Sequence, residues 1–247
     1  MALLHSFEKS GNWLFRNRGQ LPVVLFIAAI PVIWRTSTRD FNAEVVCAIN
    51  IAAIIISFAG LVVRTIAIGT TPKGTSGRNT KEQVAESLNT TGIYSCLRHP
   101  LYLGNYLMWT GIVIFTYSPV FVVIISLAFW LYYERIMFAE ERYLENKFGE
   151  RYMQWSLMVP AFIPSFRNYL PGAVPFSFKS ALRREYSGVF ATVFGFAFID
   201  NLRILFQQQT FESGRLSNIL LLAAFVLVLV LRSLKHYTSL LNEEGRS

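Results

Sequence analysis

The residues with the most chemical potential lie in the stretch Arg98–Asn105, RHPLYLGN, where an arginine and a histidine directly precede a proline and an apolar run. Proline fits the first turn of a helix, because the N–H that it lacks has no partner there anyway. The pattern predicts a helix that begins at Pro100, with His99 at its cap and Arg98 just outside. The unpaired N–H groups and partial positive charge of a helix start favour an anion. Interfacial anchoring by Arg98 and His99 is the alternative explanation.

A second group of ionisable side chains lies in Glu134–Pro164, where acids and bases alternate. Helical spacing puts Glu141 on one face with Met137, Leu144 and Phe148. A carboxylate on an otherwise apolar face is costly unless something positive meets it, and either a cationic ligand or an arginine would serve. A solvated amphipathic helix with internal salt bridges would explain the same pattern.

The elements that must position these residues are apolar helices. The chain has 247 residues, of which 53% are hydrophobic and 15% are charged, against about 25% charged residues in soluble domains. Val45–Val63 has no charge over 19 residues, which is enough to cross about 30 Å of hydrocarbon as a helix. We therefore predict an all-α, polytopic integral membrane protein with about six transmembrane helices. The other candidate spans are Leu21–Trp34, Leu101–Tyr117, Pro119–Tyr133, Tyr186–Ile199 and Leu216–Leu231.

The positive charges predict the orientation of these spans. Of the 23 Lys and Arg residues, 19 fall in alternate segments between spans and four fall in the others, which is the positive-inside pattern. Both termini and the polar segments 69–100 and 134–185 are therefore predicted to face the cytosol. The net charge of +8 then reflects topology and attraction to anionic lipids. We expect no nucleic-acid partner, because no nucleic-acid-reading motif accompanies the charge.

A tight hairpin is predicted at 101–133, with Ser118 and Pro119 as its turn. Gly104, Met108 and Gly111 share a small face on its first helix, which would let another helix approach closely. The two polar segments flank the ends of this hairpin, which predicts a functional site on one membrane face. Gly149 is expected to end the helix that follows the hairpin.

The chain divides into three predicted parts. These are N-terminal transmembrane helices at 1–68, a core at 69–164, and a C-terminal pair of transmembrane helices at 165–247. No cleavable signal peptide is predicted, because the first twenty residues are polar and no small-residue cleavage site follows Leu21–Trp34. Cys47 and Cys96 are not expected to form a metal or redox pair, and we predict no metal site.

The segment LNTTGIYSCLRHPLYLGN, followed by EERYLENKFGERYMQWSLMVPAFIP, resembles the membrane methyltransferases of the isoprenylcysteine carboxyl methyltransferase and phospholipid methyltransferase group. The resemblance covers about 89–164. It implies a methyltransferase that binds S-adenosyl-L-methionine at the cytosolic end of the hairpin and takes a lipid-like acceptor from the bilayer. The segment 69–88 and the two helices beyond Pro164 depart from the pattern. The implied cofactor-binding positions are Thr91, Gly92, Tyr94, His99, Pro100, Tyr102, Gly104, Asn105, Glu140, Glu141, Phe148 and Tyr152, and the implied catalytic positions are His99, Arg98 and Glu141.

Residue chemistry is compatible with that implication. Tyr102 or Tyr94 could hold a sulfonium by a cation–π contact, while glutamates suit an ammonium and the helix start or His99 suits a carboxylate. Methyl transfer to an anion needs positioning more than acid–base catalysis. An amine acceptor would instead need a base, for which His99 and Glu141 are the candidates.

The acceptor has two competing interpretations. The basic, glycine-containing loop Lys73–Lys81 favours the phosphate of a lipid head group, and the alternative is the carboxylate of a lipidated cysteine. The sequence does not indicate an oligomeric state.

Two other classes of function remain open. One is a membrane reductase that uses NADPH, because sterol reductases resemble this chain around the histidine-proline-x-tyrosine step and the terminal prolines. The other is a non-catalytic transporter or scaffold, whose mark would be charges deep in the spans. Asp200 and Arg203 hint at such charges, but their spacing predicts that they pair with each other.

Overall fold

The structure, a computed structural model, describes residues 2–38, 41–74 and 85–246. Over those residues it consists of helices and connecting segments without a strand, so the predicted all-α class is confirmed. The elements are α1 (Ala2–Arg16), α2 (Leu21–Arg35), α3 (Ala43–Gly69), the 3₁₀ turn η2 (Gly92–Ser95), α4 (Pro100–Ile114), α5 (Pro119–Phe148), α6 (Glu150–Met158), α7 (Phe178–Gln208) and α8 (Leu216–Tyr237).

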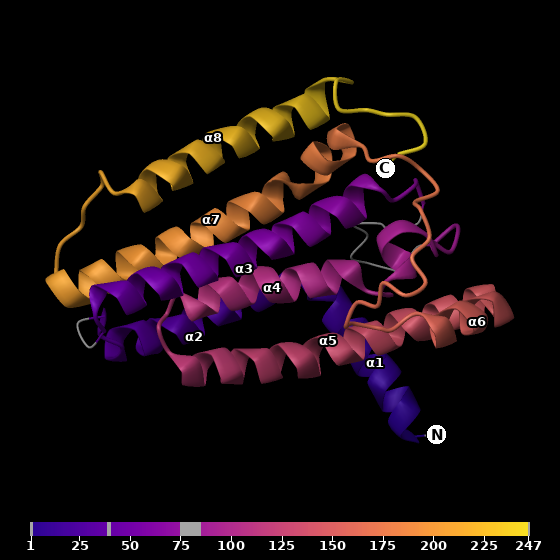
Figure 1. Ribbon diagram of the computed structural model, residues 1–247, viewed down its shortest axis with the longest axis horizontal. Helices are drawn as coiled ribbons and strands as arrows, with labels where there is room; N and C mark the ends of the chain where they lie inside the picture. The colour runs from indigo at the N-terminus through magenta and orange to yellow at the C-terminus, as the bar shows by residue number, and fades with distance from the viewer. Residues whose placement is uncertain (1, 39–40, 75–84, 247) are drawn as a thin grey trace.

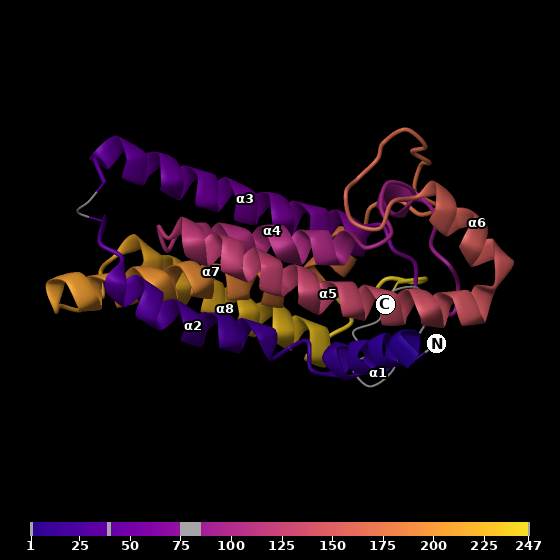
Figure 2. The same cartoon turned by 90° about the horizontal axis from the view of Figure 1, so that it is seen from below.

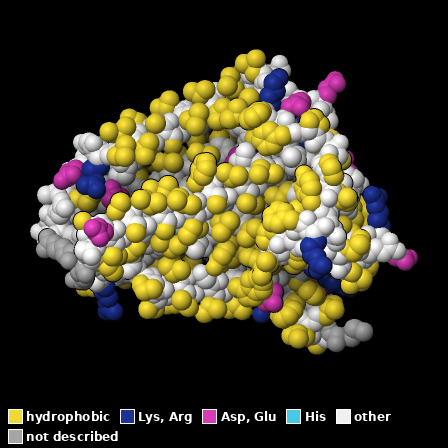
Figure 3. All heavy atoms as spheres, in the orientation of Figure 1, with side chains coloured by type: hydrophobic (Ala, Val, Ile, Leu, Met, Phe, Trp, Pro, Cys, Tyr) yellow, Lys and Arg dark blue, Asp and Glu magenta, His cyan; other side chains and the backbone are white. Residues whose placement is uncertain are grey.

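Helices run side by side along the long axis of the molecule, as expected for a polytopic membrane protein (Figures 1 and 2). They are α2, α3, α4, α5, α7 and α8. Among the described residues, α3, α5, α7 and α8 are long and apolar enough to span a membrane. The apolar part of α2, Pro22–Arg35, is shorter. Helix α4 has 15 residues, or roughly 22 Å at 1.5 Å per residue. Hydrophobic side chains cover the sides of the bundle and charged ones gather toward its two ends (Figure 3).

Local sequence signals explain where several helices begin and end. The side chain of Asn42 accepts a hydrogen bond from Val45 N at 2.8 Å at the start of α3, and Ser177 accepts one from Ser180 N at 3.1 Å at the start of α7. Ser118 does the same for Phe121 N at 3.3 Å, directly before Pro119. These are favourable capping residues. Gly149 has φ +54° and ends α5 as predicted, because glycine adopts positive φ at little cost.

The structure corrects three helix boundaries. Helix α4 ends at Ile114, so the hairpin turn is 115–118 instead of only Ser118 and Pro119. Helix α5 continues without a break from the hairpin through the acidic segment to Phe148. Helix α3 continues to Gly69, which puts Arg64 inside a helix where the sequence suggested a loop. The ends of charge-free runs were a poor guide to the ends of these helices, because a helix can continue through a charged residue that has a buried partner.

The predicted small face of α4 packs against α3. A Cβ at Gly104 would overlap the side chain of Arg64 and would lie 2.9 Å from the carbonyl oxygen of Gly60. At Gly111 a Cβ would overlap Ser57, whose Oγ donates a 2.8 Å hydrogen bond to the carbonyl of Met108. The absence of side chains therefore lets α3 and α4 approach closely, as in membrane helix pairs with small residues at the interface.

The two ends of the bundle differ in what they carry. The N- and C-termini lie at the end where α4 begins, together with α6 and the segment that leads to α7 (Figure 1). The connections after α2, α4 and α7 lie at the opposite end. This arrangement puts the termini and the two long polar segments on one side. We call this side the α6 end.

Candidate functional site

The imidazole of His99 lies between two carboxylates at the α6 end. Its Nε2 is 2.8 Å from Glu141 Oε1, and its Nδ1 is 3.7 Å from Glu140 Oε2. Adjacent residues near the end of α5 thus contact opposite sides of one ring at the start of α4. The side chain of His99 is only 6% exposed. The contact with Glu141 is a hydrogen bond, whereas the contact with Glu140 is too long for one and is an ion pair only when the ring carries a proton.

Arg98 contacts the same glutamate from the other direction. Its Nε and Nη2 donate to the two oxygens of Glu141 at 2.9 and 3.3 Å. Its Nη1 donates to the carbonyls of Val159, at 3.0 Å, and Ser156. These carbonyls lie at the C-terminal end of α6, where a cation is favourable. The positive partner that Glu141 requires is therefore an arginine, and His99 is a further hydrogen-bond partner. Arg98 also links Glu141 of α5 to the C-terminal end of α6.

The start of α4 has the predicted form, with Pro100 in the first turn and His99 at the N-cap. The side chain of His99 makes no capping hydrogen bond and is free to face the glutamates. One turn along, the ring of Tyr102 stacks on His99 with a centroid distance of 5.6 Å. Tyr102 in turn packs on Tyr133 at 4.7 Å, and Tyr133 stacks on Phe129 at 4.1 Å. A continuous aromatic column therefore leads from the charged groups into the apolar bundle.

The segment 160–173, which follows α6, is hydrogen-bonded along the residues that precede α4. Arg98 N donates to Pro160 O at 2.9 Å, and His99 N donates to Ala161 O at 3.2 Å. Gly92 has φ +61° and donates to Leu170 O at 2.9 Å. The hydroxyl of Thr91 accepts from Ala173 N at 3.1 Å. Thr91 and Gly92 thus hold the backbone of segment 160–173 in place through these hydrogen bonds.

Tyr94, Phe148 and Tyr152 meet in one hydrophobic cluster, which has Leu88, Tyr152, Trp155 and Val159 at its centre. Burial raises the pKa of the Tyr94 hydroxyl to about 12, and it raises the pKa of the Tyr152 hydroxyl as well. Both tyrosines are therefore neutral at physiological pH. Within the described part of the chain, several polar atoms in and beside this cluster are buried without a hydrogen-bond partner. They are Asn89 Nδ2, Arg142 Nε, Tyr152 OH and Trp155 Nε1.

Unpartnered buried donors are uncommon, because each costs about 1–3 kcal/mol. Tyr152 and Trp155 belong to the cluster, and Asn89 directly follows Leu88 of the cluster in the chain. The cluster therefore combines an aromatic surface with hydrogen-bond donors that lack acceptors, which is the composition of a ligand pocket.

Asn105 and Gly104 lie away from the His99 ring. Asn105 accepts a hydrogen bond from Arg64 Nη1 and donates to Tyr133 OH at 3.1 Å. Gly104 lies in the α3–α4 contact described above. Packing and this polar network account for the positions of both residues, and their role in cofactor binding stays a prediction.

The sequence reasoning missed the ion pair between Arg64 of α3 and Glu185 of α7. Arg64 Nε and Nη2 donate to the Glu185 carboxylate at 2.6 and 2.9 Å, and the two side chains are 17% and 4% exposed. A signal was available, since Arg64 is followed by the apolar residues 66–68 and so interrupts an apolar helix. Such a charge needs a partner within the bundle.

Arg18, which follows α1, was also missed. Its charge acts on Glu140 and on Tyr102, and its guanidinium lies 4.0 Å from the ring centre of Phe15. Nothing in the local sequence distinguishes Arg18 from the other basic residues at the N-terminus. Only the packing of α1 on α5 brings it near the site.

The fold and this site together define a polytopic helical membrane protein with an ionisable centre where α4 begins and α5 ends. Residues 45–151 match the phospholipid methyltransferase family, so this segment is similar to members of that family. The segment includes the ring of His99, both glutamates and the whole of α4.

Curated relatives match a similar part of the chain. The protein-S-isoprenylcysteine O-methyltransferase of Schizosaccharomyces pombe is 35% identical over 77 residues, which cover 31% of this chain and 33% of the relative. A cobalt-zinc-cadmium resistance protein of Cupriavidus metallidurans is 36% identical over 83 residues, covering 34% and 38%. The protein-S-isoprenylcysteine O-methyltransferase of Saccharomyces cerevisiae is 32% identical over 106 residues, covering 42% and 44%. The chain thus spans about a third of the length of the first two relatives. No solved structure matches.

Proposed function

We propose that this chain is a membrane methyltransferase that uses S-adenosyl-L-methionine and methylates a lipid or lipid-linked acceptor. The observation that carries the proposal is the imidazole of His99 between Glu140 and Glu141, in a segment that matches the phospholipid methyltransferase family. Relatives of this segment are named as isoprenylcysteine O-methyltransferases, which supports the reaction class.

The residues around the site fit the chemical groups of S-adenosyl-L-methionine. Asn89 Nδ2, Tyr152 OH and Trp155 Nε1 are buried donors without acceptors, and the cofactor offers adenine nitrogens, ribose oxygens and a carboxylate. Glu140 can meet its ammonium group, and the ring of Tyr102 or Tyr94 can face its sulfonium. When bound, the cofactor would supply a methyl group activated by positive sulfur. The protein would supply orientation and exclude water.

Within this proposal the charged residues have separate roles. Every guanidinium nitrogen of Arg98 donates either to Glu141 or to a carbonyl at the C-terminal end of helix α6. Arg98 therefore positions Glu141 and does not contact the acceptor. Glu141 fixes the ring of His99. Because Nε2 of His99 is held by Glu141, Nδ1 is the ring atom left to act on the acceptor. We propose that Nδ1 orients an anionic acceptor or takes the proton of a neutral one.

The acceptor we favour is an anionic lipid head group, such as a phosphate, because an anion reacts without prior deprotonation and its charge is neutralised as it reacts. The alternative is the carboxylate of an isoprenylated cysteine, as the names of the relatives suggest. The basic loop that favoured phosphate lies largely outside the described residues, since 75–84 are not described.

Cofactor binding gives a direct test. We expect the detergent-solubilised protein to bind S-adenosyl-L-methionine and its demethylated product in calorimetry, and not to bind NADPH. Glu140→Gln should weaken binding about tenfold or more, because a hydrogen bond to a charged group contributes about 1.5–3 kcal/mol. Glu134→Gln is the matched control, because Glu134 is an exposed residue of the same helix.

Binding of NADPH without binding of S-adenosyl-L-methionine would contradict the assignment and favour a reductase. Equal affinity in the wild type and the Glu140→Gln variant would remove Glu140 from the pocket.

We also propose that the α6 end faces the cytosol, on the basis of the 19-to-4 division of positive charges. Asn168 is exposed at the α6 end, and Thr210 is exposed at the opposite end. In a Cys47→Ser background, a membrane-impermeant thiol reagent should label Thr210→Cys but not Asn168→Cys from outside intact cells. The reverse pattern would refute this orientation and would deprive the site of a cytosolic cofactor.

A further inference from the structure

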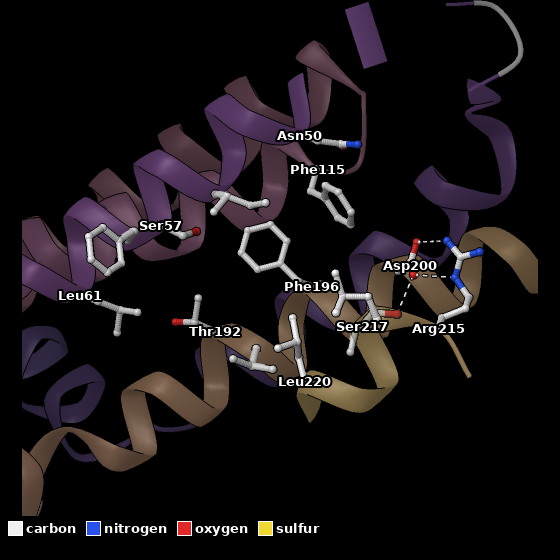
Figure 4. A pocket seen from close by; sticks show the side chains of 15 residues that line it. Asn50, Ser57, Leu61, Phe115, Thr192, Phe196, Asp200, Arg215, Ser217 and Leu220 are labelled. Carbon is white, nitrogen blue, oxygen red and sulfur yellow. Dashed lines mark hydrogen bonds and ion pairs between the residues drawn. The ribbon is translucent and has the colours of Figure 1, made fainter. Parts of the chain in front are cut away.

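A cavity of about 560 Å³ lies between α3, α7 and α8. The cavity lies away from the His99 site. It is lined by residues 50–61 of α3, by residues 192–200 in the second half of α7, and by residues 216–220 at the start of α8 (Figure 4). Its length along α3 runs from Asn50 to Leu61, or roughly 16 Å at 1.5 Å per residue. Helices α7 and α8 lie outside the segment that matches the family, so the family match does not account for this cavity.

The wall of the cavity offers little to a polar ligand. The hydroxyl of Ser57 donates to Met108 O at 2.8 Å, and that of Thr192 donates to Gly188 O at 3.0 Å. Both hydroxyls are thereby directed into the helices. Between them the wall consists of apolar side chains, including Leu61, Phe196 and Leu220 (Figure 4). A bound water needs two to four polar partners, so this part of the cavity favours hydrocarbon.

Polar groups gather at one end only. There Asp200 accepts hydrogen bonds from Arg215 Nε at 3.1 Å, Arg215 Nη2 at 3.3 Å and Ser217 Oγ at 2.7 Å (Figure 4). The predicted pairing of Asp200 with Arg203 is also present, at 4.0 Å, and it is longer than the contacts with Arg215. Asn50 lies at the same end and accepts from Tyr117 OH. The cavity is therefore polar at one end and apolar along its length.

The rim of the cavity faces the side of the bundle. Among the residues that line the cavity, Phe58 is 65% exposed, Leu216 is 70% exposed and Leu220 is 50% exposed. In a membrane this surface contacts lipid chains. A chain can therefore enter sideways from the bilayer without crossing a polar region.

We propose that the cavity binds one acyl chain of a bilayer phospholipid, with the head group at the Asp200–Arg215 end. Its volume lies within the range of roughly 300–1,000 Å³ that is typical of ligand sites. Bilayer phospholipids are the most concentrated apolar ligands around the protein, and mass action therefore favours them. The head group lies at the opposite membrane face from His99, so this lipid is distinct from the methyl acceptor. The proposal does not depend on the methyltransferase assignment.

The test uses a phosphatidylcholine that carries a photoactivatable diazirine in the middle of one acyl chain, in nanodiscs that contain the full chain. After irradiation, we expect crosslinks to concentrate in peptides that contain 54–61, 192–197 and 216–220. Leu220→Trp and Val193→Trp both add bulk to the wall of the cavity, and each should lower these crosslinks about tenfold or more. Leu222→Trp is the matched control, because Leu222 is 65% exposed on α8 and does not line the cavity.

Size-exclusion profiles and thermal unfolding identify variants that retain the fold, and only those are compared. Crosslinks spread evenly over the outer face of α8, or crosslinks that persist in both folded tryptophan variants, would overturn the proposal. Preferential labelling of the same peptides by a diazirine-bearing isoprenoid, with the phosphatidylcholine probe unable to compete, would also overturn it and would identify the cavity as an isoprenoid site.

Discussion

Replacement of Glu141 by glutamine is expected to lower methyl transfer to membrane lipid by about 10²-fold or more. The carboxylate of Glu141 contacts His99 at 2.8 Å and Arg98 at 2.9 Å, so it fixes both residues at once. Glutamine retains the size of the side chain but loses the charge, and its NH₂ group cannot accept from either partner. Misplacing an oriented group in a water-excluded site costs about 10²–10³-fold in rate. His99→Ala should have a similar effect, because it removes the ring itself.

The measurement is transfer of a labelled methyl group to the lipid fraction of membranes, with S-adenosyl-L-methionine at saturation. Glu134→Gln makes the same chemical change on an exposed residue of α5 and should retain near wild-type turnover. Arg232→Ala, close to the end of α8, should do the same. If Glu141→Gln and His99→Ala both retained near wild-type turnover and a normal size-exclusion profile, His99 and Glu141 would not belong to the active site.

The largest expected effect on stability is from Arg64→Met or Glu185→Met. Each substitution leaves its partner as an uncompensated charge inside the bundle, since the Glu185 side chain is only 4% exposed. Breaking a buried ion pair from one side costs about 3–5 kcal/mol in unfolding free energy. The double variant Arg64→Met/Glu185→Met leaves no unpaired charge on either side, so it should be considerably more stable than either single variant.

Unfolding in mixed micelles, followed by tryptophan fluorescence, measures these free energies. The matched control is the pair Arg215 and Glu212, whose side chains are 36% and 53% exposed. Exposed pairs contribute only about 0–1 kcal/mol, so Glu212→Met should change stability little. A loss below about 1 kcal/mol for both single variants of the buried pair would show that water or lipid head groups solvate these charges.

The sequence by itself determined the features that depend on neighbouring residues. Long charge-free runs predicted apolar helices, Pro100 predicted the start of α4, and Gly149 predicted the end of α5. These signals are local, because proline, glycine and hydrophobic runs act through the backbone of their own segment or through contact with lipid. The resemblance to a known family also predicted that His99 and Glu141 are catalytic residues, and this role stays a prediction.

Only the tertiary structure decided which groups meet. The sequence left open whether a cationic ligand or an arginine balances Glu141, and the packing of α4 against α5 brings Arg98 and His99 to it. It also suggested a ligand role for Gly104 and Asn105, and the approach of α3 accounts for the positions of both by packing and by Arg64. Residues 121 positions apart form the Arg64–Glu185 pair. The cost of a buried charge depends on the whole surrounding bundle, so no local pattern could have specified that partner.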